Sequence, residues 1–344
     1  MNNLNVIDVS AVVYTGASAP RFCERTSFGY PVGGIHYLMR QLCVSFGSYD
    51  AAVLCFDSPT RKQELLSGYK AGRIKRPEVY SQIEFLYEGM MSCGIACEKH
   101  DGFEADDVVD WAVKQGLGKY TEVVIVGNDY DLLHSVQPGV RFKSIRRGVS
   151  CVYPANFEEF ADPGSYTRFN TISAKKVLCG CKSDGIPALA LECGMKGEKI
   201  YKAFLEYLVE KKINCSYANT TNWKLLAVFA RDSGLFTPVD YNCMLQRVKL
   251  VYPEDCPEGL VIEPVWYRSV DQEKLAKFLT LVNDAESLRC LALRRVQLGE
   301  ADKQLMFDKS NRLKTGEYAA DNNLEHQPGV EVHSLSLNAF EKEF

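Results

Sequence analysis

The chain has 344 residues, of which 46% are hydrophobic and 24% charged, and these values are typical of a globular protein. They exclude a wholly disordered, collagen-like or small disulfide-rich protein, and the length predicts about two structural units. The formal net charge of −4 excludes a protein coated in basic surface for nonspecific nucleic-acid binding. We find no apolar run of about 18 residues and no basic leader, so the 13 cysteines are expected to be reduced thiols of a cytoplasmic protein without membrane association.

The first half of the chain alternates apolar strands with helices. Strands are predicted at 4–9, 51–57, 94–99 and 121–129, and helices at 33–46, from Pro77 onward and at 104–115. Residues 58–92 are a long excursion between strands, basic in their first part. The alternation predicts an α/β fold with a mostly parallel sheet, whose functional site lies beyond the carboxyl ends of the strands.

Helical periodicity predominates after residue 170. Two helices joined by tight turns are predicted between 171 and 210, where KSDGIPALALECGMKG supplies the turn residues. Residues 222–310 are predicted to be mostly helical, with an irregular stretch at 235–265, and 311–344 to be a flexible tail. We therefore expect an α/β domain over 1–170, a helical region over 171–310 and the tail.

Basic residues gather at two places in the sequence. Six basic residues and one acid lie between 61 and 76, and four basic residues without an acid lie between 141 and 147. Either cluster is explained by a solvated protein face or by contacts with nucleic acid.

Acidic residues collect where strands are predicted to end. Five of the ten positions from 101 to 110 are acidic, and this cluster alone is also explained by the solvated first turns of a helix. Further acids follow the other strands, namely Asp8, Asp57, Asp129 and Asp131, with Asp184 later in the chain. Converging carboxylates repel one another unless cations neutralise them, and oxygen ligands favour Mg²⁺ or Mn²⁺. Two such ions about 4 Å apart support phosphodiester hydrolysis.

Six segments together resemble the 5′-nuclease superfamily, which comprises flap endonucleases, phage 5′–3′ exonucleases and the N-terminal nuclease domain of bacterial DNA polymerase I. They are VIDVS (6–10), CFD (55–57), SGYKAGR (67–73), GFEADD (102–107), VGNDYDLL (126–133) and KSDGIPAL (182–189). The resemblance covers about residues 4–200. It implies a PIN-like sheet, a helical arch at about 58–92 and a helix–hairpin–helix-like (H3TH) element at about 176–200.

The resemblance also implies the site residues. The first Mg²⁺ would be bound by Asp8, Asp57, Glu104 and Asp106, with Asp107 adjacent, and the second by Asp129, Asp131 and Asp184. Lys70 and Arg73 would contact the scissile phosphate. Other contacts with DNA would come from Lys62, Tyr69, Gly194, Lys196 and Gly197. Mn²⁺ would substitute for Mg²⁺, and a K⁺ ion would bind at the hairpin.

Three positions depart from the family pattern. Cys181 stands where the family has a further Asp, and a thiol is a poor Mg²⁺ ligand, so the second metal should bind more weakly. Gly185 replaces the usual Asn, and Glu192 replaces the first glycine of the hairpin. These two changes put the K⁺ site in doubt.

The leading hypothesis is a metal-dependent, structure-selective 5′–3′ exonuclease or flap endonuclease of replication and repair, in a bacterial or phage-infected cytoplasm. Its substrates would be branched or 5′-ended DNA or RNA–DNA hybrids. A replication clamp or single-strand-binding protein would dock on the tail at 311–344. The alternative is a catalytically impaired DNA-junction-binding protein of the same fold. A PIN-type ribonuclease fits less well, because that simpler fold lacks the basic insertion and the hairpin.

Overall fold

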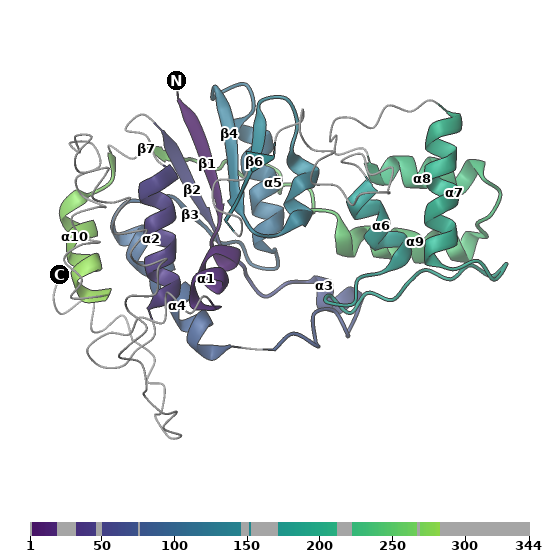
Figure 1. The fold of residues 1–344 in the computed structure, drawn as a ribbon, viewed down its shortest axis with the longest axis horizontal. Coiled ribbons are helices and arrows are strands. Elements are labelled where there is room, and N and C mark those ends of the chain that lie inside the picture. The colour runs from purple at the N-terminus through teal and green to yellow at the C-terminus, as the bar shows by residue number, and fades with distance from the viewer. Residues whose placement is uncertain are drawn as a thin grey trace, which may run out of the picture.

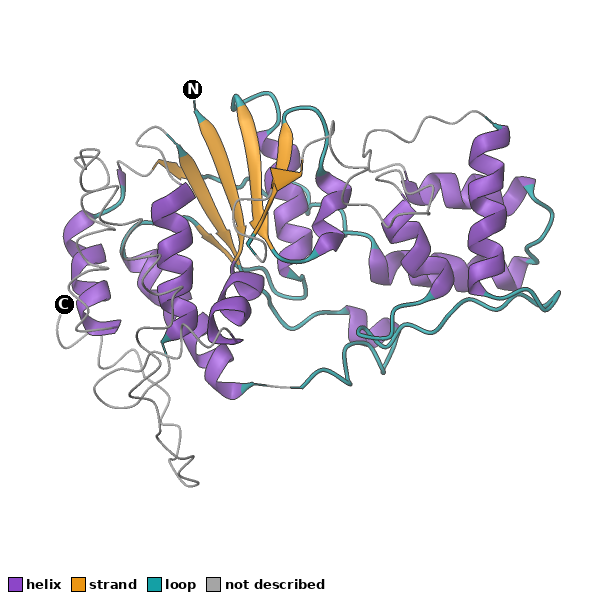
Figure 2. Ribbon diagram, in the orientation of Figure 1, coloured by secondary structure: helices purple, strands orange, loops and turns teal. Residues whose placement is uncertain are grey.

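A seven-stranded sheet forms the centre of one lobe, and a group of helices forms the other (Figures 1 and 2). The computed structural model describes residues 2–18, 32–45, 50–74, 76–145, 151–152, 171–211, 222–266 and 269–282. The strands are β1 (Asn3–Asp8), β2 (Ala51–Cys55), β3 (Cys97–Glu98), β4 (Glu122–Gly127), β5 (Val140–Ser144), β6 (Cys151–Val152) and β7 (Val265–Trp266). The order is β3-β2-β1-β4-β5-β6, with β7 beside β2. Strands β1 to β5 are parallel, while β6 and β7 are antiparallel to their neighbours, so the predicted α/β fold with a mostly parallel sheet is confirmed.

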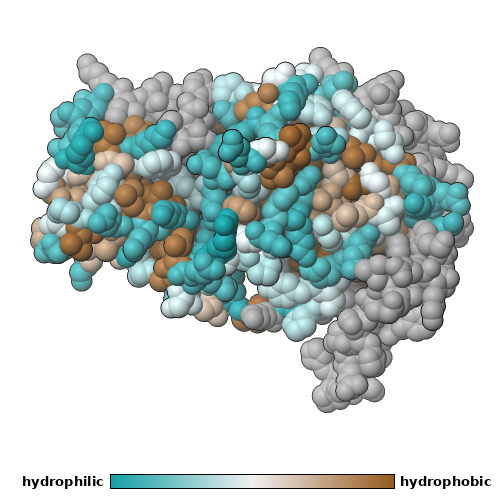
Figure 3. Space-filling model, turned by 180° about the vertical axis from the view of Figure 1, so that it is seen from behind, coloured by the Kyte–Doolittle hydropathy of each residue, from teal (hydrophilic) through white to brown (hydrophobic). Residues whose placement is uncertain are grey.

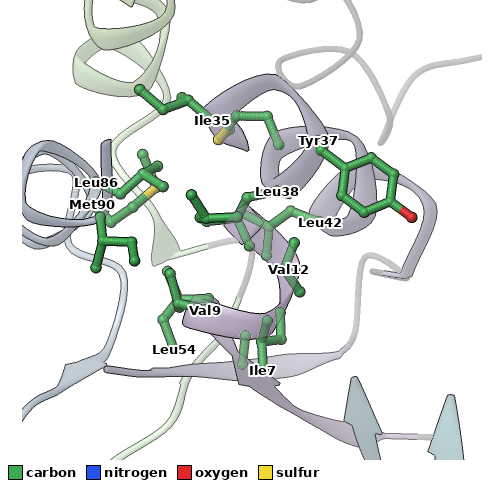
Figure 4. Close-up of a cluster of buried hydrophobic side chains, with 14 of the residues drawn as sticks. Ile7, Val9, Val12, Ile35, Tyr37, Leu38, Leu42, Leu54, Leu86 and Met90 are labelled. Atoms are coloured by element: carbon green, nitrogen blue, oxygen red, sulfur yellow. The ribbon is translucent and has the colours of Figure 1, made fainter. Parts of the chain in front are cut away.

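The sheet is apolar on both faces and separates two hydrophobic cores. Along β4, Val124 and Val126 face the first core, and Val123 and Ile125 face the second, as the period of two requires. The first core is covered by α1 (Val9–Ser18), α2 (Gly33–Ser45), α4 (Pro77–Ser92) and α10 (Gln272–Val282). Figure 4 shows side chains of α1, α2 and α4 gathered beside those of β1 and β2. The second core is covered by α5 (Ala105–Gly116). Because both faces are covered, the strands read as continuous apolar runs.

Among the described residues, the second lobe contains four helices with a core of their own. They are α6 (Thr171–Cys179), α7 (Gly197–Glu210), α8 (Asn222–Asp232) and α9 (Pro238–Val251). Phe204, Phe229 and Met244 are among the buried side chains that hold them together. Residues 235–265, predicted to be irregular, therefore contain a 14-residue helix. Its start is marked by a capping box in which Thr237 and Asp240 bond each other's backbone amides.

The chain returns to the sheet after the helical lobe. Trp111 Nε1 on α5 donates a hydrogen bond to the carbonyl oxygen of Glu254 (2.7 Å), and the amide of Ile262 donates to Gln115 Oε1 (2.9 Å). Strand β7 then pairs with β2, and Phe278 of α10 is buried in the first core. Residues from about 254 to 282 thus belong to the sheet lobe, although a helical region over 171–310 was expected.

Several elements differ from the sequence-based expectation. Helix α1, α3 (Lys62–Leu65), β5 and β6 were not predicted, and β3 is much shorter than 94–99. In the described residues, no helix is long and apolar enough to cross a membrane. On the face turned away in Figure 1, hydrophobic side chains form separate patches divided by hydrophilic ones (Figure 3).

Candidate active site

Acidic side chains stand at the junctions where strands give way to helices. Asp8 ends β1, and its Oδ1 accepts a hydrogen bond from the amide of Ala11 in the first turn of α1 (3.0 Å). Asp129 follows β4 in the same way, and its Oδ1 accepts from the amide of Asp131 (3.0 Å) at the start of the 3-10 helix η2 (Tyr130–Ser135). Each acid therefore caps a helix with one carboxylate oxygen, which fixes its orientation.

Two further carboxylates complete this first group of acids. Asp57 lies just beyond β2, and its Oδ1 accepts from the amide of Ala105 (2.9 Å), so β2 is tied to the start of α5. Asp106 lies in the first turn of α5. Acids at the ends of three parallel strands and in the first turn of one helix thus lie at the same edge of the sheet.

The first group is rich in uncompensated negative charge. Within the described part of the chain, Asp8, Asp57, Asp106 and Asp129 have no ion pair with a basic side chain inside 4.0 Å. Burial, together with the charges of Asp57 and Asp129, raises the pKa of Asp8 to about 7. Burial and the charges of Asp129 and Asp8 raise the pKa of Asp106 well above its usual range. These shifts show that the acids lie close enough to repel one another.

A divalent cation fits the chemistry of this first group. Among the described residues, no three acidic, His or Cys side chains already lie in the arrangement of a metal site. That spacing is expected while the carboxylates repel one another, and a cation would remove the repulsion. The donors are all carboxylate oxygens, which suit Mg²⁺ or Mn²⁺ rather than a soft metal.

Glu104 is the centre of a buried ionic network. Its carboxylate accepts hydrogen bonds from Lys62 Nζ (3.0 Å), Lys70 Nζ (2.5 Å) and Tyr69 Oη (3.0 Å). Burial opposes ionisation of Glu104, but Lys62 and Lys70 lower its pKa overall. Lys62 and Tyr69 are each only 3% exposed, so the structure corrects the expectation that they contact DNA: both hold Glu104 in place.

Asp107 has a structural position. Its side chain is fully buried, and its Oδ2 accepts from the amide of Glu104 (2.9 Å) in the capping box of α5. Its Oδ1 accepts from the amide of Glu254 (2.9 Å) and from Lys62 Nζ (3.4 Å). Both oxygens are therefore occupied by protein donors, and the structure does not support Asp107 as a metal ligand.

A second group of acids, Asp131 and Asp184, is neutralised by basic side chains. Lys176 of α6 forms ion pairs with Asp131 and with Asp184 Oδ2 (3.3 Å), and Arg73 pairs with Asp184 Oδ1 (2.5 Å). Cys181 Sγ donates a hydrogen bond to Asp184 Oδ2 (3.1 Å). Burial alone would raise the pKa of Asp184, but this hydrogen bond and the two cations lower it to about 2.

The segment around Lys70 is fixed by docking against the turn that carries Asp184. The amide of Lys70 donates to the carbonyl oxygen of Asp184 (2.8 Å), and Lys70 adopts a left-handed backbone with φ of 54°. Gly185 also has a positive φ of 70°, and a Cβ atom there would lie 2.4 Å from the carbonyl oxygen of Gly68. Strained non-glycine backbone persists only where its surroundings hold it, so this contact positions the Lys70 ammonium beside the acids.

In the hairpin between α6 and α7, two of the three residues predicted to contact DNA are exposed. Gly194 and Lys196 are exposed, and Lys196 is the N-cap residue of α7. Gly197 is buried, because its backbone packs so closely on α6 that a Cβ atom would lie 2.8 Å from the carbonyl oxygen of Leu178. The prediction that Gly197 contacts DNA is therefore wrong in this structure, and its role is close helix packing.

Other sequence-based candidates differ in placement. Arg141 Nε pairs with Glu122 (2.6 Å) and Lys143 is largely buried, so these members of the second basic cluster belong to the sheet. The remaining members at 146 and 147 and the tail at 311–344 lie outside the described residues. Lys176 was missed, because nothing in the sequence distinguishes it from its neighbour Lys175.

Comparison with known proteins finds similarity in the part of the chain that carries these acids. Residues 3–161 match the family described as "5'-3' exonuclease, N-terminal resolvase-like domain". This region of the chain belongs to the 5′-nuclease superfamily. The resemblance that the sequence motifs indicated is thereby confirmed over residues 3–161, and this range contains the whole first group of acids.

Individual relatives match this chain over limited stretches. A 5'-3' exonuclease of Aquifex aeolicus is 28% identical over 199 residues, which is 55% of this chain and 65% of the relative. DNA polymerase I of Treponema pallidum is 36% identical over 96 residues, which is 28% of this chain and 10% of the relative. The chain thus spans less than two thirds of the length of either protein.

Solved structures of similar proteins show lower identity. Flap endonuclease-1 from Methanococcus jannaschii is 13% identical with a TM-score of 0.47, and the match covers 89% of this chain and 93% of that one. T5 5'-exonuclease with bound zinc is 16% identical with a TM-score of 0.45, covering 90% and 99%. Membership of the superfamily rests on the sequence matches above.

Proposed function

We propose that this chain is a divalent-metal-dependent 5′ nuclease that hydrolyses phosphodiester bonds near the 5′ ends or flaps of DNA. The observation that carries the proposal is the group of four unpaired carboxylates, Asp8, Asp57, Asp106 and Asp129, at one edge of the sheet. A stable protein keeps such repulsion only where a bound cation offsets it or where function requires it. Family membership favours nuclease chemistry among the reactions that an acidic Mg²⁺ site supports.

These four carboxylates would hold Mg²⁺, or Mn²⁺ in its place. When bound, the ion supplies a more acidic water and a positive charge for the phosphoryl oxygens. The protein's contribution is orientation: backbone amides hold one oxygen each of Asp8, Asp57 and Asp129. The other oxygen of each carboxylate carries no hydrogen bond from a described residue and remains free for a ligand.

Lys70 and Arg73 would bind the phosphate that is cleaved. The charge of the Lys70 ammonium offsets a small part of the rise in the pKa of Asp8 and of Asp106, so Lys70 lies near the proposed metal ligands. The Arg73 side chain is half exposed and reaches Asp184 from the same segment. A phosphate that binds between Lys70 and Arg73 would replace their ion pairs with Glu104 and Asp184 by charge-assisted hydrogen bonds to its own oxygens.

The helical lobe would hold the duplex next to this site. The exposed Gly194 and Lys196 lie where α7 begins, and backbone contacts at a helix start position a phosphate without reading sequence. The amide of Glu192 is bonded to Asp240 (3.1 Å), so this amide does not take part. Because such contacts do not read the base sequence, the nuclease would select its substrates by the structure of the DNA. RNA–DNA hybrids would be further substrates. Docking of a clamp or single-strand-binding protein on residues 311–344 stays a prediction.

Cleavage of a 5′-labelled flap duplex tests the proposal. The wild type, Asp8→Asn/Asp106→Asn and the control Asp101→Asn would be incubated with Mg²⁺, Mn²⁺ or a chelator. Asp101 is an exposed acid close in sequence to the site, so its variant controls for a change in net charge. We expect short 5′ products from the wild type and the control with either metal, and none from the double variant or with the chelator.

The opposite result would favour the second function. If the wild type binds the flap but leaves flap, nicked, blunt and RNA-primed substrates intact with both metals, the chain is a DNA-junction-binding protein. The ion pairs that already neutralise Asp131 and Asp184 are the observation that favours this alternative.

A further inference from the structure

The two groups of acids differ in how their charge is balanced. In the first group, four carboxylates lack an ion pair among the described residues. In the second group, the two carboxylates of Asp131 and Asp184 meet two cations, Lys176 and Arg73, so the local formal charge is neutral. A divalent ion would therefore relieve more repulsion in the first group than in the second.

The oxygen atoms of the second group are already occupied. Asp184 Oδ1 is bonded to Arg73 at 2.5 Å, and its Oδ2 accepts from both Lys176 Nζ (3.3 Å) and Cys181 Sγ (3.1 Å). Asp131 Oδ2 is bonded to the same Lys176 ammonium. A divalent ion would have to displace these donors before it reached either carboxylate.

Lys176 is built into this position rather than free to leave. It projects from α6, and its side chain is only 23% exposed. The two ion pairs and partial burial mean that removing the ammonium leaves two carboxylates without their shared counter-ion. A third acid that would compete with Lys176 is missing, because residue 181 is a cysteine whose thiol donates to Asp184 and does not add charge.

We propose that the ammonium of Lys176 takes the place of a second metal ion, so that this nuclease binds one divalent cation tightly. The residues of the second group do not fit a Mg²⁺ site as they stand. This inference rests on the proposed function, because it concerns the second of two neighbouring acidic groups in a metal-dependent nuclease. A lysine carries one positive charge at all physiological Mg²⁺ concentrations, so the second group stays neutralised without metal.

Mn²⁺ binding to the full chain tests the inference without any activity measurement. The number of ions and their Kd would be obtained by calorimetry and by electron paramagnetic resonance of free Mn²⁺. Lys176→Met removes the charge but keeps the length of the side chain. Lys175→Met is the matched control, because this neighbour on α6 lies over the ring of Tyr201 (5.8 Å) and has no contact with the acids in the described structure.

We expect one tight ion for the wild type and for Lys175→Met. We expect Lys176→Met to gain a second ion with a Kd at least about tenfold lower than any second-site Kd of the wild type. The double variant Lys176→Met/Cys181→Asp should bind the second ion more tightly still, because it adds a carboxylate ligand.

Each alternative outcome has a separate meaning. Two ions of similar affinity in the wild type would overturn the inference and leave the proposed nuclease function intact. No ion in the wild type would overturn the inference together with the metal-dependent function. If the wild type binds one ion and both Lys176 variants remain folded by circular dichroism but gain none, Lys176 is not what excludes the second ion.

Discussion

Lys62 offers the sharpest test of the buried network, because one ammonium serves two buried carboxylates. Its Nζ lies 3.0 Å from Glu104 and 3.4 Å from Asp107, and all three side chains are at most 6% exposed. Removing one partner of a buried ion pair costs about 3–5 kcal/mol, because the remaining charge has neither water nor a counter-ion. We expect Lys62→Met to lower the free energy of unfolding by about that amount.

Urea unfolding followed by circular dichroism would measure this loss, at neutral pH and with a chelator present. The control is Lys202→Met: this lysine is 79% exposed and lies 3.9 Å from Glu206 on the same helix, so its loss should stay below about 0.5 kcal/mol. Replacing the carboxylates too, as Lys62→Met/Glu104→Gln/Asp107→Asn, should recover part of the stability.

Two results would refute the reasoning about Lys62. A loss equal to that of the Lys202 control would mean that the carboxylates are solvated and need no buried counter-ion. Full recovery of Lys62→Met by Mg²⁺ would mean that Glu104 and Asp107 accept a metal ion directly, as the sequence motif alone suggested.

Three further predictions concern pH and backbone geometry. Burial lowers the pKa of His36 to about 4, so only the unfolded state takes up a proton at this residue as the pH falls from about 6.5 to 4. The free energy of unfolding should therefore fall by up to about 1.4 kcal/mol per pH unit in this range. His36→Gln should flatten that part of a stability-versus-pH curve, and an unchanged slope would contradict the prediction. Because the pKa of Asp8 is raised, its ionisation destabilises the fold progressively from about pH 4 to pH 7. Above pH 7 and with a chelator present, Asp8→Asn should raise the free energy of unfolding by roughly 2 kcal/mol. A loss of stability in this variant would argue against repulsion among the acids. Gly185→Ala should speed proteolysis between residues 66 and 74 more than Gly194→Ala does. Both glycines have a positive φ, but of the two only Gly185 lies where an added Cβ atom would meet backbone, namely that of Gly68. Equal cleavage of the two variants would show that the packing of Gly185 on Gly68 is not needed to hold this segment.

The sequence predicted the sheet and its acidic edge well, because both follow from local patterns. Continuous apolar runs marked β1, β2 and β4, and the acids after them had to meet where parallel strands end. Short or edge elements such as β3 and β5 carry too few residues for a clear period. Helix α1 was not predicted because its β-branched residues favour strands. The sequence feature that marks its start is Asp8, whose carboxylate caps the helix.

The partners of each acid could not be predicted, because they come from distant parts of the chain. Lys62 and Glu104 are 42 residues apart, and nothing in either motif says that the lysine is buried. Lys176 lies beside another lysine, and only the orientation of α6 selects it for Asp131 and Asp184. Residue type thus indicated where charge gathers, whereas tertiary packing decided which charges are cancelled.

The late return of the chain to the sheet has a consequence during synthesis. Strand β7 covers Ala51 and Ala52 of β2, yet it is made only after the whole helical lobe. At about 5–20 residues per second, this part of β2 waits on the order of ten seconds or more on the ribosome for its neighbour. An apolar strand edge left open that long is a site for a chaperone or for mispairing between nascent chains. Slow translation after residue 55 should therefore lower the yield of native protein more than slow translation after residue 266.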